Sequence, residues 1–180
     1  DHLIGHETVA ASNTSTLSIT DLVSGCGHSH QMIGLHFFNP VLKMNLVEVV
    51  HTSETEPSVL DHAVEFVKSL AKEPVVLMDS PGFVVNRLLM QYINSAAKIL
   101  ESGVCSLADL DKAMKLGANH PIGPLALADL IGLDVVVASL DNLYRQLEDE
   151  SYRACSSLQR MVKEGRLGRK VGRGFYEYSK

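Results

Sequence analysis

An Asp-Ser-Pro-Gly breaker at residues 79–82 divides this chain into two parts with different hydrophobic patterns. Proline and glycine so close together interrupt both helices and strands, so we expect an interdomain hinge here. Before the breaker, short runs rich in β-branched residues alternate with helical segments, and after it apolar residues recur at helical spacing almost to the end. The pattern predicts an α/β domain over residues 1–80 and an all-α domain over residues 81–180.

The first part contains four runs typical of strands and one amphipathic helix. The helix is expected to begin at Pro57, a residue suited to the first helical position. Leu60, Val64, Val67 and Ala71 then recur along one face of it. A helix placed between strands at this spacing favours α/β architecture. The predicted strands cover residues 8–12, 33–37, 46–50 and 75–78.

The second part is predicted to be helical almost throughout. A long apolar segment covers residues 83–101, and a second helix begins at Ser106 and ends at Gly117. A further apolar stretch runs over residues 125–147, with Gly132 as an interruption. A stretch that is apolar over so much of its surface must be covered. An intramolecular core and a homodimer interface are both open as explanations.

Composition excludes several classes of protein. With 180 residues and 46% hydrophobic content, the chain can bury a real core, which argues against disorder. The net charge of -5, without a long run of like charge, argues against a nucleic-acid surface. No apolar run reaches about 18 residues, so no membrane-spanning helix is expected. One basic cluster near the C-terminus is typical of a solvated face, and it comprises Lys163, Arg166, Arg169, Lys170 and Arg173.

The three cysteines Cys26, Cys105 and Cys155 form neither an even set nor a Cys-x-x-Cys pair. We therefore expect free thiols in a reducing compartment such as the cytoplasm, without disulfides or a zinc site. No charged segment followed by a short apolar run opens the chain, so no signal peptide is expected. Because the chain begins at Asp1 and not at methionine, there is room for an upstream targeting segment, and mitochondrial and peroxisomal locations stay open.

His36 and Glu48 are the first candidates for chemistry. His36 stands where an apolar run meets Phe-Phe-Asn-Pro, so the chain leaves the predicted sheet at the histidine, and ligands of open α/β sheets bind outside the carboxyl ends of strands. Glu48 lies inside the next apolar run, where a carboxylate is costly unless it is paired. A hydrogen bond between them would fix the imidazole tautomer and raise its basicity. From the pattern alone, a strand-capping His36 and a solvent-facing Glu48 remain open as alternatives.

Three other polar features are weaker. The cluster at residues 12–16 follows a predicted strand and is typical of a turn or a helix cap. Asn86 lies at the start of an apolar helix just past the hinge, where a role in a cleft is plausible. His28 and His30 lack a Cys, Asp or Glu at ligand spacing, so we interpret them as loop histidines and expect no metal site.

Six motifs carry a resemblance to a known family. They are Ser-Asn-Thr-Ser-Thr-Leu-Ser-Ile at 12–19, Gly-Leu-His-Phe-Phe-Asn-Pro-Val at 34–41, Leu-Val-Glu-Val-Val at 46–50, Asp-Ser-Pro-Gly-Phe-Val-Val-Asn-Arg at 79–87, Ala-Met-Lys-Leu-Gly at 113–117 and Gly-Arg-Gly-Phe-Tyr near the end. In order and spacing they cover essentially the whole chain, and they resemble the 3-hydroxyacyl-CoA dehydrogenase family.

The resemblance implies the C-terminal portion of a Rossmann-like NAD-binding domain, followed by a helical domain for substrate binding and homodimerisation. It also implies NAD-dependent interconversion of (S)-3-hydroxyacyl-CoA and 3-oxoacyl-CoA in fatty acid metabolism. The acyl-CoA is then the substrate, and NAD is the cofactor. His36 would take the proton of the 3-hydroxyl, and Glu48 would orient His36 and stabilise its protonated form. Ser15 and Asn86 would hydrogen-bond the substrate, and the cofactor contacts would come from Asn13, Ser15, Asn39 and Lys170.

One element of the family does not occur in this sequence. The Gly-x-Gly-x-x-Gly turn that holds the cofactor pyrophosphate should precede these motifs by roughly a hundred residues. The glycines within 25–27 and 165–174 have the wrong spacing for it. We therefore expect a truncated form of the parent enzyme. The parent reaction is assigned by the resemblance, whereas activity of this chain alone is not.

Three alternatives stay open. A related dehydrogenase could act on a sugar acid or a small hydroxy acid, although the Phe-Phe pair at 37–38 and the run at 120–129 look closer to the acyl-CoA enzymes. A non-catalytic helical dimerisation module gains support from the missing turn and from the apolar stretch at 125–147. The dehydrogenase part of a multifunctional β-oxidation chain is the third, and the ending soon after residues 175–178 favours the monofunctional form.

Overall fold

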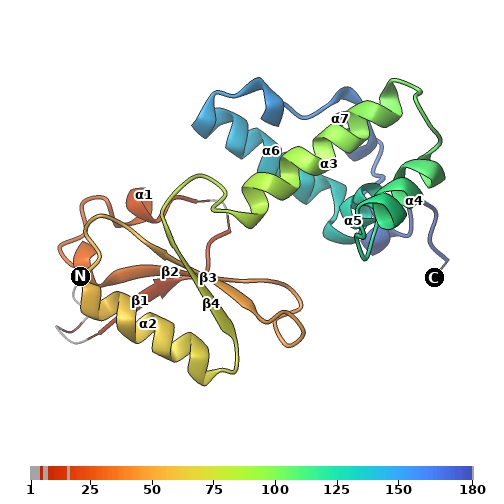
Figure 1. The fold of residues 1–180 in the computed structure, drawn as a ribbon. Coiled ribbons are helices and arrows are strands. Elements are labelled where there is room, and N and C mark those ends of the chain that lie inside the picture. The colour runs from red at the N-terminus through yellow and green to blue at the C-terminus, as the bar shows by residue number, and fades with distance from the viewer. Residues whose placement is uncertain (1–4, 6–7, 16, 180) are drawn as a thin grey trace. The chain divides into compact units, whose positions relative to one another are not determined.

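The computed structural model describes residues 5, 8–15 and 17–179 and divides into two compact units (Figure 1). The first unit is Asp1–Val84 and the second is Val85–Lys180. Each unit has buried cores of its own, so each is described by itself. The first contains strands and helices and the second is helical, which confirms the expected fold class.

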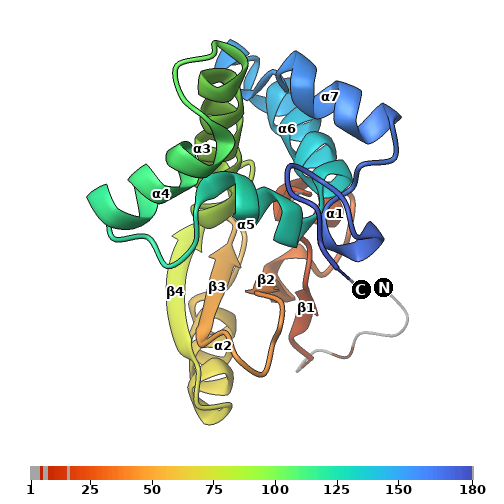
Figure 2. The ribbon, with the colours of Figure 1, turned by 90° about the vertical axis from the view of Figure 1, so that its right-hand side faces the viewer.

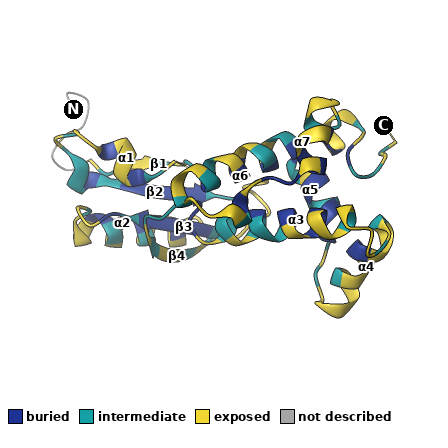
Figure 3. Cartoon of the chain, turned by 90° about the horizontal axis from the view of Figure 1, so that it is seen from above, coloured by how far each residue is buried: buried dark blue, intermediate teal, exposed yellow. Residues whose placement is uncertain are grey.

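A mixed sheet with the strand order β1-β2-β3-β4 forms the first unit (Figure 2). β1 (Ala10–Ser12) runs parallel to β2 (Met32–Phe37), and β2 runs antiparallel to β3 (Leu46–His51). β3 runs parallel to β4 (Glu73–Met78). These strands overlap the four predicted runs, and β2 and β3 form the buried centre of the sheet (Figure 3).

The two faces of the sheet carry different side chains because successive residues of a strand point to opposite sides. On one face, α2 (Pro57–Ser69) packs through its apolar stripe against β2 and β3. On the other face lie α1 (Ile19–Val23) and the buried ring of Phe83. Gly34 makes this close packing possible, since a Cβ there would lie 2.9 Å from Ile19. Between α1 and β2 lies the short 3-10 helix η1 (Ser29–Gln31).

The predicted face of α2 is shorter than the sequence pattern indicated. The helix begins at Pro57 as expected and ends at Ser69, and Val67 is fully buried. Ala71 lies beyond the helix with a left-handed φ of 55° and is exposed. The apolar spacing continues past the point at which the chain turns towards β4.

The second unit consists of five α-helices and two 3-10 helices within the described residues. Gly132 separates α5 from α6 with a φ of 105°, as the interruption in the apolar stretch indicated. The core covers one side of this stretch, where Leu133 and Leu140 are fully buried, while Leu130 remains 53% exposed. No helix of the described residues is long and apolar enough to span a bilayer. The elements are α3 (Val85–Glu101), α4 (Leu107–Gly117), α5 (Pro124–Ile131), α6 (Leu133–Leu147), η2 (Glu150–Tyr152), α7 (Ser156–Lys163) and η3 (Arg169–Val171).

A buried aspartate holds the C-terminal segment against the helices of the second unit. Asp129 on α5 is only 1% exposed, and its carboxylate accepts the N–H groups of Phe175 at 2.8 Å and Tyr176 at 2.9 Å. The Tyr178 hydroxyl donates to the same carboxylate at 2.9 Å. The segment passes so close that a Cβ on Gly174 would lie 2.0 Å from Asp129 Oδ1.

We expect Gly174→Ala to lower the free energy of unfolding by at least about 2 kcal/mol, because the new methyl group must displace this carboxylate from its donors. Gly117→Ala is the matched control, since nothing lies within 4 Å of a Cβ there. Alanine also favours the helix end by up to about 1 kcal/mol. Urea unfolding followed by circular dichroism measures both changes. Equal stability of the two variants would contradict this account of the C-terminal segment.

Candidate active site on the β2–β3 hairpin

His36 and Glu48 face each other on neighbouring strands. They form a directly opposed pair in the register of β2 and β3. His36 Nδ1 lies 2.7 Å from Glu48 Oε2, and the two residues are 6% and 1% exposed. A bond this short between buried groups is typical of a charge-assisted hydrogen bond. The structure therefore brings together the two residues that the sequence nominated.

The other carboxylate oxygen of Glu48 has its own partner. The backbone N–H of Val84 donates to Glu48 Oε1 at 3.1 Å. A buried carboxylate needs such partners, because each lost bond leaves a charge without solvation. With Nδ1 turned to Glu48, the second ring nitrogen of His36, Nε2, has no hydrogen-bond partner among the residues that the structure describes.

Two aromatic rings flank the imidazole. The Phe38 ring centroid lies 4.4 Å from that of His36 at an interplanar angle of 50°. Phe83 lies between β4 and α3, and its ring centroid is 5.7 Å from that of His36 at an interplanar angle of 54°. Phe83 is only 3% exposed. Phe83 has a left-handed φ of 52°, a conformation that non-glycine residues rarely adopt. Aromatic packing restricts rotation of the imidazole and keeps water from its faces.

The polar loop that follows β1 contacts the same strand end. The Asn13 amide oxygen accepts the N–H of Phe37 at 3.0 Å, one residue past the histidine. Thr14 Oγ1 accepts the N–H of Leu17 at 2.9 Å and closes the loop locally. Ser15 lies exposed in this loop. Asn13 therefore positions the carboxyl end of β2, whereas the sequence nominated it for the cofactor.

Asp79 fixes the start of α1, which follows this loop in the sequence. Its Oδ2 accepts the Ser18 hydroxyl at 2.7 Å and the Thr20 N–H at 2.8 Å. Burial acts to raise the pKa of Asp79, but the hydrogen bonds from Ser18, Thr20 and Ile19 outweigh it and hold the pKa below its usual value near 3.8. Asp79, the first residue of the Asp-Ser-Pro-Gly breaker, thus links the end of β4 to the start of α1.

The loop that joins β2 to β3 covers residues 38–45 and contains Asn39, which is exposed. Lys72, just before β4, donates from Nζ to the carbonyl oxygens of Val41 at 2.6 Å and Met44 at 2.8 Å. This ammonium fixes the tip of the hairpin that carries both His36 and Glu48. Leu42 lies at the tip and is 98% exposed, an unusual state for a leucine.

Two nominated residues belong to the second unit. Asn86 is the second residue of α3 and is half-buried. Lys170 lies in η3, where its Nζ is 2.6 Å from both carboxylate oxygens of Asp134. The bond from Lys170 lowers the pKa of the Asp134 carboxyl. The structure therefore groups Asn13, His36 and Glu48, and it describes Asn86 and Lys170 within a separate unit.

Several contributors to the site were not nominated from the sequence. The Val84 N–H could not be nominated, because a backbone donor cannot be recognised from the residue type. Lys72 gave no motif, although a lone lysine before a predicted strand is a place to look for such a contact.

His28 and His30 lie with their ring centroids 6.1 Å apart, and among the described residues no group of three potential ligands could hold a metal ion.

Comparison with known proteins shows to which family models and relatives this chain is similar. The model of "3-hydroxyacyl-CoA dehydrogenase, NAD binding domain" matches residues 1–80, and that of "3-hydroxyacyl-CoA dehydrogenase, C-terminal domain" matches residues 82–178. The 3-hydroxybutyryl-CoA dehydrogenase of Clostridioides difficile is 50% identical over 180 residues, which is 100% of this chain and 64% of the relative. The human mitochondrial hydroxyacyl-coenzyme A dehydrogenase is 42% identical, over 99% of this chain and 57% of its own length.

Solved structures show the same likeness. The (S)-3-hydroxybutyryl-CoA dehydrogenase PaaH1 from Ralstonia eutropha superposes with a TM-score of 0.96 at 46% identity, covering 99% of this chain and 63% of that one. FadB2 of M. tuberculosis gives 0.94 at 40% identity, covering 98% of this chain and 62% of that one. The chain thus spans about three fifths of the length of the curated relatives it matches.

Removing the lysine that holds the hairpin tip should loosen the loop selectively. We expect Lys72→Met to speed amide exchange at Lys43 and Met44 roughly tenfold, because the loop loses two charge-assisted hydrogen bonds. Lys72→Arg should restore much of the protection. Hydrogen exchange followed by NMR measures this, with Lys68→Met on the exposed side of α2 as the control. Unchanged exchange in Lys72→Met would show that the lysine is dispensable for the loop.

The low pKa of Asp79 predicts a pH-dependent contribution to stability. A depressed pKa in the folded state means that ionised Asp79 stabilises the fold above its unfolded pKa, near 3.8, and that this is lost as pH falls through the folded value. We expect Asp79→Asn to cost about 1 kcal/mol at neutral pH and almost nothing once the pH has fallen below the folded pKa of Asp79. Unfolding titrations at several pH values test this, with the exposed Asp61→Asn as the control. A cost independent of pH would contradict the assigned bonds.

Proposed function

The chain belongs to the 3-hydroxyacyl-CoA dehydrogenase family, and we propose that the protein carrying it interconverts (S)-3-hydroxyacyl-CoA and 3-oxoacyl-CoA with NAD. The observation that supports this most directly is the buried pair of His36 and Glu48, with Nε2 of the histidine left for the substrate. A carboxylate-oriented imidazole is suited to moving one proton to and from a hydroxyl group.

In the oxidative direction, His36 Nε2 accepts the proton of the substrate 3-hydroxyl. Glu48 accepts the Nδ1–H, fixes the tautomer with the lone pair on Nε2 and offsets the positive charge that forms on the ring. NAD, when bound, would supply the acceptor for the hydride that leaves C3 of the substrate. In the reductive direction the imidazolium returns the proton from Nε2 to the 3-oxo group.

The residues present fit the reacting end of NAD. Exposed amide and hydroxyl groups follow β1 and β2 at their carboxyl ends, where ligands of α/β sheets bind. We propose that Asn13, Ser15, Asn39 and Lys170 contribute to holding the cofactor. Among the described residues, the Asn13 side chain bonds through its oxygen to the Phe37 N–H, which leaves the amide N–H₂ for this role. The 180 residues contain no Gly-x-Gly-x-x-Gly turn, so they offer no cradle of this kind for the pyrophosphate.

Substrate binding is proposed for Ser15 and Asn86, whose side chains can hydrogen-bond the oxygen at C3. We also propose that residues 81–180 form a substrate-binding and dimerisation domain. Exposed apolar side chains in the second unit support a homodimer through this domain, among them Leu88 at 65% and Leu130 at 53%. We propose a cytoplasmic location, which fits three cysteines that show no disulfide among the described residues.

The proposed function is tested in the natural protein that contains this chain, by following NADH with acetoacetyl-CoA. We expect His36→Gln to lower kcat by roughly 10²–10⁴-fold with a much smaller change in KM, because the proton is moved only in the transition state. Glu48→Gln should also lower kcat. The exposed His62→Gln is the matched control. Near-normal turnover of a folded His36→Gln variant would remove His36 from this role.

A further inference from the structure

A pocket of about 560 Å³ lies within the second unit, and none of its lining residues was nominated for the candidate active site. It is formed by α4, the turn that precedes α5, the start of η3 and the C-terminal segment. Its volume is in the range of small-molecule sites. Apolar groups form part of its wall, chiefly Leu116, Pro121 and Ile122.

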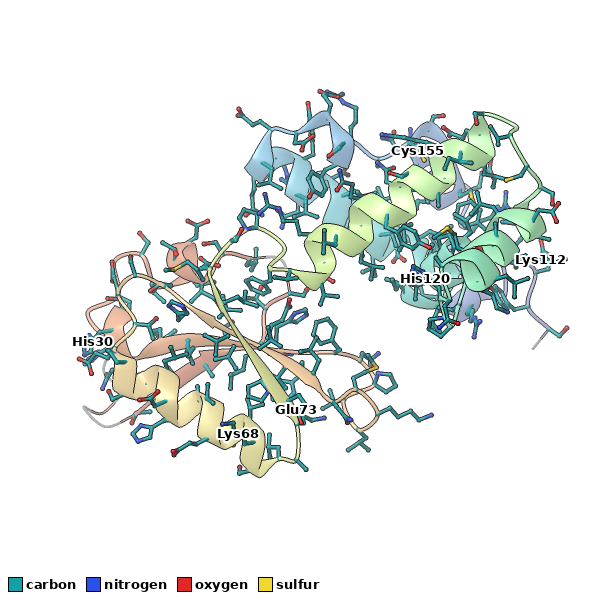
Figure 4. The ribbon with its side chains drawn as sticks, viewed as in Figure 1. His30, Lys68, Glu73, Lys112, His120 and Cys155 are labelled. Carbon is teal, nitrogen blue, oxygen red and sulfur yellow. The ribbon has the colours of Figure 1, made fainter. Side chains whose placement is uncertain are left out.

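Three cations line this pocket. Lys112 and Lys115 are three positions apart on α4, so they lie on the same side of that helix, and Figure 4 marks Lys112. Arg169 enters from η3, with its guanidinium carbon 5.1 Å from the centroid of the Tyr178 ring. The arginine is therefore held in place by a cation–π contact before any ligand arrives.

These cations differ from their neighbours in having no acidic partner. Lys170 next to Arg169 is paired with Asp134, and Arg173 is paired with Glu177 at 2.9 Å. No carboxylate of the described residues lies within 4.0 Å of Lys112, Lys115 or Arg169. In a chain with a net charge of -5, three unpaired cations around one hollow are a local excess of positive charge.

One carboxylate also lines the pocket, and its oxygens are already engaged. Asp111 accepts the N–H groups of Leu125 and Ala126 at 2.9 Å each, at the first turn of α5. The Tyr176 hydroxyl donates to its Oδ2 at 2.9 Å. Two backbone donors, a hydroxyl and the positive end of the helix dipole offset this charge, so the three cations remain available to a ligand.

We propose that this pocket binds the phosphate group of a small organic phosphate ester. Two lysines supply point charges and the planar arginine supplies paired donors, a set that matches a dianionic phosphate better than a single carboxylate. The apolar part of the ester then packs against Leu116, which is otherwise 76% exposed, and against Ile122. The site is proposed independently of the dehydrogenase activity, because none of its lining residues is among the individual residues assigned to that reaction.

Phenyl phosphate is the probe of choice, because it joins a phosphate to a small apolar body. We expect it to shift the amide resonances of α4 and of the turn at 121–123 in an NMR titration, with an affinity about tenfold above that of inorganic phosphate. Lys115→Met and Arg169→Met should each weaken binding by roughly tenfold or more. Lys163→Met is the matched control, since Lys163 is an exposed lysine outside the pocket. Circular dichroism confirms that each variant is folded.

Three results would overturn the proposal. One is the absence of saturation by phenyl phosphate at about 10 mM, the range of very weak binding. Another is equal weakening by Lys163→Met and Lys115→Met, which would indicate a diffuse charge effect over the basic surface. The last is saturable binding of an acidic peptide, but of neither phosphate probe, which would make the pocket a protein contact. Each readout is independent of turnover, so failure of the proposed dehydrogenase activity leaves the proposal standing.

Discussion

The buried carboxylate of Glu48 is the constraint on which the first unit depends. An ionised group that is 1% exposed is tolerated only where both oxygens are hydrogen-bonded, and here His36 and the Val84 N–H meet that need. The pairing also specifies the register of the hairpin. A slip by one residue would turn Glu48 towards α2 and the apolar cluster that contains Val47 and Val49, away from its present donors.

The second unit also contains buried carboxylates. Their hydrogen-bond partners differ from the partner of Glu48, and this difference bears on what each carboxylate can do. Asp129 and Asp111 are satisfied by backbone N–H groups and tyrosine hydroxyls, which bind the charge and hold segments together. The partner of Glu48 is an imidazole, a group whose second nitrogen can accept a proton from a ligand and return it. Burial and pairing are thus common to all three residues, and the chemical nature of the partner decides what each can do.

Periodicity predicted the elements of this fold well, because burial on one face leaves a direct trace in the sequence. The strands around His36 and Glu48, the start of α2 at Pro57 and the interruption at Gly132 all follow from such patterns. The pairing of His36 with Glu48 was only one of several open interpretations until family motifs were considered. Contacts to backbone atoms, such as those of Lys72 with the hairpin tip, were not predicted from the sequence, because a carbonyl oxygen cannot be recognised from the residue type.

The pairing of His36 with Glu48 does not require the glycine-rich turn that this sequence lacks, because pairing and pyrophosphate binding depend on different physical interactions. Binding a pyrophosphate requires backbone N–H groups at a helix N-terminus. Orienting the imidazole requires Glu48, the Val84 N–H, two aromatic rings and the bond from Phe37 N–H to Asn13, all of which lie within residues 13–84. These contacts around the His36 imidazole therefore lie within the first unit, and binding of the pyrophosphate is a separate requirement.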